Sequence, residues 1–112
     1  MKKITFLLFL LFSAMCFSQS LTGVDKLNDQ YQKADKELNS VYNKLKKELG
    51  ETDKKALIEA QKAWIKFRDL NCKFKSQEDS EGGIIAEKMK VDCLTQLTVE
   101  RSKELKKLLD GL

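Results

Sequence analysis

The chain has no proline and only five glycines in 112 residues, so few positions can interrupt an α-helix. Those glycines are Gly23, Gly50, Gly82, Gly83 and Gly111. The stretches between them carry apolar residues at alternating steps of three and four, the spacing of one face of an amphipathic helix. In the second stretch, the predicted buried face includes Phe67 and Phe74 and is widened by Leu70. The predicted helices cover about residues 25–49, 53–79 and 85–110. The sequence therefore predicts an all-α fold, a small antiparallel three-helix bundle.

The N-terminal segment has the composition of a secretory signal peptide. Two lysines open the chain, an apolar run follows over residues 4–12, and small residues precede the first polar segment. The apolar run is shorter than the roughly 20 residues that a transmembrane helix needs, so we expect no stable membrane span after cleavage. We place cleavage after Ser18, which makes residues 1–18 the signal peptide and residues 19–112 one exported domain.

Cys16 leaves an alternative open, in which the mature chain is a lipoprotein that begins at this cysteine. Met15 directly before it fits lipoprotein processing poorly, so we favour a periplasmic or secreted protein without a lipid anchor. In either case the domain functions outside the cytoplasm, where disulfides persist.

Charge and composition exclude several classes of function. Removing the signal peptide lowers the formal net charge from +4 to +2, and acidic and basic residues alternate without a basic stripe, so we expect no nucleic-acid partner. The chain has no histidine, which removes the usual neutral-pH base and the commonest metal ligand. We therefore expect no cofactor, no metal and no enzymatic activity. We also expect a monomer. The less favoured enzyme hypothesis is a glycoside hydrolase that uses paired carboxylates such as Glu78 with Asp79.

Two cysteines remain after signal removal, Cys72 and Cys93, and an even count in a small exported domain indicates a disulfide. A helical hairpin that turns at Gly82–Gly83 pairs residues whose numbers sum to about 165. The partner of Cys72 in that register is Cys93. We therefore predict one interhelical disulfide between the second and third helices.

The same register places polar residues opposite one another inside the bundle. Trp64 faces Arg101, which allows a cation–π contact. A turn near Gly50 pairs the first two helices by numbers that sum to about 102, which brings Asp35 level with Arg68 and places Asn39 near Trp64. Buried charges need partners, so we interpret this polar seam as a lock on helix register and leave a binding site as the alternative.

Three motifs in this order resemble a known family of small exported bacterial proteins. They are the run from Tyr31 through Asp35 and Asn39 to Tyr42, the run from Ala60 to Asp69 with Cys72 after it, and Gly82-Gly83 followed by Cys93, Leu97-Thr98 and Arg101. The chain is identified as similar to the lysozyme-inhibitor LprI-like N-terminal domain family. It lacks an additional cysteine pair that many members have, one cysteine of which would fall near Lys26–Leu27, and Phe67 stands where tyrosine is frequent.

The resemblance adds two motif residues, Gln61 and Thr98, to the polar seam. The complete predicted seam is Asp35, Asn39, Gln61, Trp64, Arg68, Thr98 and Arg101.

The resemblance implies an exported envelope binding module, with lysozyme or another envelope protein as its partner. The acidic stretch 76–83, with Glu78, Asp79 and Glu81, is the candidate binding loop, because its carboxylates could approach a basic cleft. The alternative is a structural envelope protein with no inhibitory activity.

Overall fold

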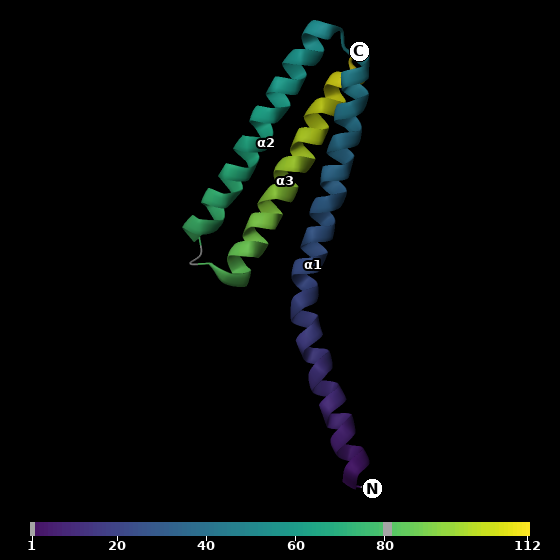
Figure 1. The fold of residues 1–112 in the computed structure, drawn as a ribbon, viewed down its shortest axis with the longest axis vertical. Helices are drawn as coiled ribbons and strands as arrows, with labels where there is room; N and C mark the ends of the chain where they lie inside the picture. The colour runs from purple at the N-terminus through teal and green to yellow at the C-terminus, as the bar shows by residue number, and fades with distance from the viewer. Residues whose placement is uncertain (1, 80–81) are drawn as a thin grey trace.

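The computed structural model describes the backbone of residues 2–79 and 82–112, and the side chains of residues 23–77 and 82–112. It contains three helices, α1 (Lys2–Glu48), α2 (Glu51–Asp79) and α3 (Gly83–Asp110), and no strand in the described part of the chain. Successive helices are antiparallel, so α1 and α3 run in the same direction and the C-terminus lies at the same end of the bundle as the α1–α2 connection (Figure 1). The predicted all-α three-helix fold is confirmed.

Helix boundaries lie at three of the four places where glycine was expected to interrupt the helices, among them the end of α3 at Asp110, directly before Gly111. Gly82 and Gly83 have positive φ angles of 105° and 77°, which other residues rarely adopt, and they form the turn before α3. At the first connection, the carbonyl of Gly50 accepts a hydrogen bond from the N–H of Lys54 at 2.9 Å, so α2 begins two residues before the predicted start. The predicted break at Gly23 is wrong, since α1 continues through it. A single glycine costs a helix only about 1 kcal/mol relative to alanine.

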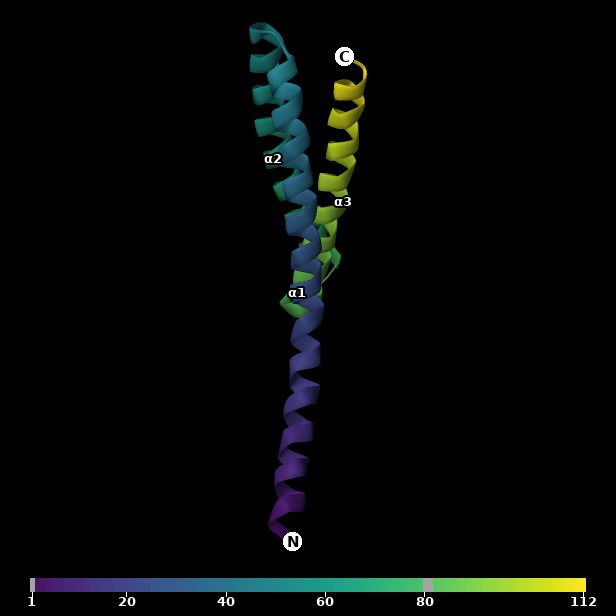
Figure 2. The same cartoon turned by 90° about the vertical axis from the view of Figure 1, so that its right-hand side faces the viewer.

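The third helix is central to the packing. It contacts α1 along much of its own length and α2 less extensively, whereas the backbones of α1 and α2 approach each other at few points, and in Figure 1 α3 lies between them. Figure 2 shows the same bundle turned by 90°. Five buried aliphatic side chains from all three helices form the core. They are Leu38, Val41, Leu45, Leu57 and Leu105, with Tyr42, Leu49, Trp64 and Leu109 packed against them. The predicted register places Leu45 near Leu57 and Leu38 near Trp64, and all four side chains belong to this core.

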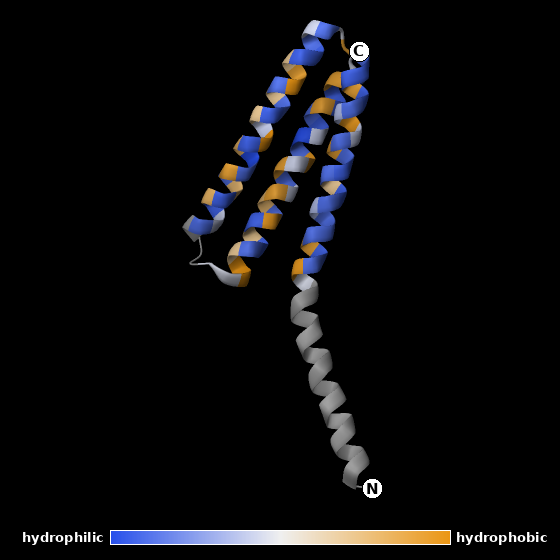
Figure 3. Ribbon diagram, viewed as in Figure 1, coloured by the Kyte–Doolittle hydropathy of each residue, from blue (hydrophilic) through white to orange (hydrophobic). Residues whose placement is uncertain are grey.

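One part of the predicted core lies on the surface instead. Phe67, Leu70 and Phe74 of α2 are 57%, 57% and 61% exposed, although their spacing suggested a buried face. The buried residues in this part of α2 are Arg68, Cys72 and Ser76, which lie one or two positions further along the chain, so the buried face is turned by more than about 100° around the helix. Apolar residues are therefore distributed around α2 and are not confined to its inner side (Figure 3).

Candidate functional site

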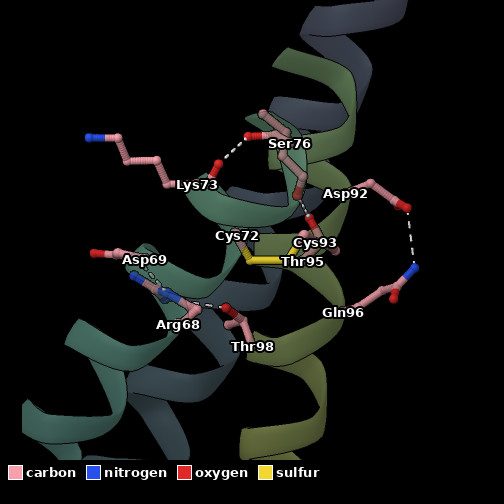
Figure 4. Close-up of a disulfide and its surroundings, with 11 residues drawn as sticks. Arg68, Asp69, Cys72, Lys73, Ser76, Asp92, Cys93, Thr95, Gln96 and Thr98 are labelled. Atoms are coloured by element: carbon pink, nitrogen blue, oxygen red, sulfur yellow. Dashed lines mark hydrogen bonds and ion pairs between the residues drawn. A yellow bond between two sulfur atoms is a disulfide. The ribbon is translucent and has the colours of Figure 1, made fainter. Parts of the chain in front are cut away.

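The disulfide between Cys72 and Cys93 joins the C-terminal part of α2 to α3 (Figure 4). Their Cα atoms are 5.5 Å apart, within the usual range for a disulfide, and Cys72 is fully buried. The predicted pairing and the hairpin register behind it are confirmed. Because the bond fixes which side of α2 faces α3, it also determines the direction of the side chains one turn away.

Arg68 lies one turn before Cys72 on the same side of α2, and its side chain is 8% exposed. Its Nη1 donates to the hydroxyl of Thr98 on α3 at 3.3 Å, and its Nε donates to the neighbouring Asp69 at 2.9 Å. Nη1 also lies 3.8 Å from a carboxylate oxygen of Asp35 on α1. This guanidinium therefore contacts side chains from all three helices, which is what a buried charge needs in order to be tolerated.

Trp64 lies near two guanidinium groups. The Cζ atoms of Arg68 and Arg101 are 5.1 Å and 5.8 Å from the centre of its ring system, both within cation–π range. Arg101 also donates from Nε to the side-chain oxygen of Gln61 at 3.0 Å, and from Nη1 to Glu104 at 3.0 Å. Trp64 and Arg101 therefore lie opposite each other, as the predicted register of the α2–α3 hairpin placed them.

Asn39 lies on the solvent-exposed side of the seam. Its side chain is exposed, and its Nδ2 donates to the carboxylate of Asp35 at 3.4 Å. Asp35 itself is 43% exposed in its side chain. The two residues therefore form the solvent-facing edge of the seam, while Gln61, Arg68 and Thr98 form its buried part.

Three residues of the network were not anticipated from the sequence. Tyr31 of α1 lies 5.6 Å from the guanidinium carbon of Arg68, and Asp69 and Glu104 are hydrogen-bonded to the two arginines. Burial raises the pKa of the Tyr31 hydroxyl; the Arg68 charge opposes that shift and nearby carboxylates add to it. The sequence signal for Tyr31 was its place one helical turn before Asp35, on the same side of α1.

The arrangement is suited to holding helices together. Arg68, Trp64 and Tyr31 are long or bulky side chains, and they fill the space where the backbones of α1 and α2 stay apart. Removing one partner from such a network costs more than the network contributes in net stability, so it specifies one arrangement of the helices. This favours the register lock that we predicted over a ligand site within the seam.

Ser102 of α3 offers a test of the core beside this network. It is 8% exposed, and its hydroxyl has no hydrogen-bond partner within the described residues. A buried hydroxyl without a partner is costly, and alanine is also the better helix former. We expect Ser102→Ala to raise the free energy of unfolding by about 1 kcal/mol in urea denaturation. An equal or lower value would show that this hydroxyl is satisfied in solution.

The acidic residues of the predicted binding loop follow the buried part of α2. Glu78 and Asp79 lie in the last turn of α2, and Glu81 follows it, but the side chains of all three fall outside the described residues. Among residues 23–77 and 82–112, no cluster of three His, Cys, Asp or Glu side chains is arranged to hold a metal ion. In that same part of the chain, no helix is long and apolar enough to cross a membrane.

The chain is thus a small helical bundle that is linked by one disulfide and built around a buried arginine network. The profile of the family described as "Lysozyme inhibitor LprI" matches residues 16–105. The chain belongs to this family, as the three motifs suggested. It is also 35% identical over 97 residues to an uncharacterized protein of Rhizobium meliloti (strain 1021), an alignment that covers 75% of this chain and 69% of that protein. No solved structure matches the chain significantly.

Proposed function

We propose that the protein is exported and acts in the bacterial envelope as a binding protein that inhibits lysozyme or a related wall-degrading hydrolase. The observation that carries this proposal is the match to the lysozyme inhibitor family over residues 16–105. The Cys72–Cys93 disulfide supports an oxidising compartment, and the composition of residues 1–18 supports a cleaved signal peptide.

Inhibition by such a bundle would be steric and would depend on a rigid shape. The seam and the disulfide hold the three helices in one arrangement, so little conformational entropy is lost when an exposed surface binds a partner. The acidic stretch 76–83 at the tip of the α2–α3 hairpin is our candidate contact. Many lysozymes are basic, and opposite charge at the contact accelerates association even when the net charge of the protein does not.

The test is lysis of bacterial cell walls, followed by turbidity, in the presence of animal or bacterial lysozymes and increasing amounts of the oxidised protein. We expect saturable inhibition at concentrations of about 1 µM or below, the range of a specific interface. Absence of inhibition with every lysozyme type would refute the proposal and leave a structural envelope protein. Clearing of the walls without lysozyme would instead support the glycoside hydrolase hypothesis.

Charge reversal tests the contact separately. We expect Glu78→Lys with Asp79→Lys to raise the half-inhibitory concentration at least about tenfold, because two attractive contacts become repulsive. The matched control is Glu48→Lys with Glu51→Lys, which makes the same change in net charge at the opposite end of the bundle, where both residues are exposed. Equal effects of the two pairs would assign the loss to net charge and contradict a contact at the hairpin tip.

A further inference from the structure

Six exposed apolar residues of α2 form one continuous stripe along the helix, and a seventh, Ile65, lies outside it. Its members are Ala56, Ala60, Ala63, Phe67, Leu70 and Phe74, and all six are exposed. They follow one another at steps of four, three, four, three and four, which is the heptad spacing of a coiled-coil seam. From first to last the stripe is about 27 Å long. A surface with this period can pack against another helix, because each residue of the stripe can enter a gap between residues of the facing helix.

The order of sizes along the stripe points to its partner. The three small residues stand first and the three large residues last. A second α2 that lies antiparallel across the stripe, centred between Ala63 and Phe67, places every large residue against a small one. The facing pairs are Ala56 with Phe74, Ala60 with Leu70, and Ala63 with Phe67, each occurring twice. Alternation of large and small side chains is the condition for close packing between two helices.

Charges beside the stripe agree with the same register. In an antiparallel pair of helices, the positions that directly precede the first apolar residue of each heptad face one another. In this stripe the first apolar residues are Ala60, Phe67 and Phe74. Here these positions are Glu59, Lys66 and Lys73, so Glu59 of each copy faces Lys73 of the other, with opposite charges. Lys66 meets its own copy on the two-fold axis, which is one repulsive pair against two attractive ones. Beyond the apolar pairs, Asp53 faces Gln77, so polar residues follow the apolar stripe at both of its ends.

A groove of about 430 Å³ gives the large residues of the second copy a place to enter. Ala56 and Ala60 line it from α2, and Leu105, Leu108 and Leu112 line it from the end of α3 and the C-terminus. Leu108 and Leu112 are 59% and 71% exposed. The groove lies toward the α1–α2 connection, where α2 diverges from α3 in the view of Figure 2.

We propose that this stripe is the interface of a two-fold homodimer, in which α2 of each copy packs antiparallel against α2 of the other. Phe74 of one copy then covers Ala56 of the second and reaches the groove beside it. The contact is self-complementary, as a closed two-fold interface must be. The proposed dimer does not depend on the lysozyme proposal. It replaces our expectation, stated from the sequence, that the protein is a monomer.

Sedimentation of the exported, oxidised protein tests the proposal, with its N-terminus established by intact mass. We expect a reversible monomer–dimer equilibrium between about 1 µM and about 1 mM, because one helix pair is a small interface. Phe67→Ser with Phe74→Ser should weaken dimerisation at least about tenfold without loss of helicity, since both side chains are already exposed. The control Ile84→Ser with Ile85→Ser removes two equally exposed apolar side chains outside the stripe and should leave the dimer intact.

The antiparallel register has its own test. Lys66→Cys should form a disulfide-linked dimer on mild oxidation, because the two copies of residue 66 meet on the axis. Glu59→Cys should not, since residue 59 lies about 20 Å from its own copy in this arrangement. Glu59→Lys and Lys73→Glu should each weaken the dimer, and the two together should restore it.

Several results would overturn the proposal. A protein that stays monomeric at the highest concentration contradicts it, as does a dimer that survives the Phe67 and Phe74 substitutions. Cross-linking of Glu59→Cys and Lys66→Cys to the same extent would contradict the antiparallel register. If the wild type is monomeric and the Phe67 and Phe74 substitutions abolish lysozyme inhibition, the stripe binds the hydrolase and not a second copy.

Discussion

Replacing Cys72 and Cys93 together with alanine should lower the free energy of unfolding by about 3 kcal/mol. The bond closes a loop over a sequence separation of 21 residues, and without it the unfolded chain regains the entropy of that loop. A domain of this size should then melt roughly 12–24 °C lower. The effect is large because a small bundle has few other buried contacts with which to compensate.

Thermal unfolding followed by circular dichroism measures this effect, and a reductant supplies its control. Wild-type protein in reductant should melt near the temperature of the double variant, whereas the double variant itself should not respond to the reductant. If the melting temperature of the wild type is unchanged by reduction, the helices hold their arrangement without the bond. In that case the disulfide contributes little to stability.

Arg68→Ala should be the next most destabilising of these changes, at about 2–3 kcal/mol. The loss has two sources. The stem of the arginine no longer packs beside Trp64 and Tyr31, and the fully buried hydroxyl of Thr98 loses its partner. The carboxylates of Asp35 and Asp69 add little to the loss, because both are about half exposed and return to water.

Two further variants separate these sources by urea denaturation. Arg68→Met keeps most of the stem and should recover part of the loss. Adding Thr98→Val to it removes the orphaned hydroxyl and should recover a further 1 kcal/mol or so. A double variant no more stable than Arg68→Ala would show that the charge itself, through Asp35 and Asp69, holds the seam together.

Much of the fold could be predicted because local signals agreed with one another. The glycine pair at 82–83 set the hairpin, and in that register the cysteines fell opposite each other, as the structure shows. The turn near Gly50 likewise placed Asp35 opposite Arg68, and in the structure a carboxylate oxygen of Asp35 lies 3.8 Å from Nη1 of Arg68. The partners Asp69 and Glu104 were missed, because exposed carboxylates are abundant in this chain and only side-chain direction selects among them.

What the sequence alone determined is therefore the number of helices, their order and the register in which they pair, since turns and helix spacing are local properties. Which side of α2 is buried was decided only by the tertiary structure. The stripe through Phe67 is the more apolar, yet the neighbouring stripe through Gln61, Arg68 and Cys72 faces the bundle. The physical reason is the covalent bond. Cys72 must point at Cys93, so Arg68 one turn before it points inward as well, and the phenylalanines remain on the surface.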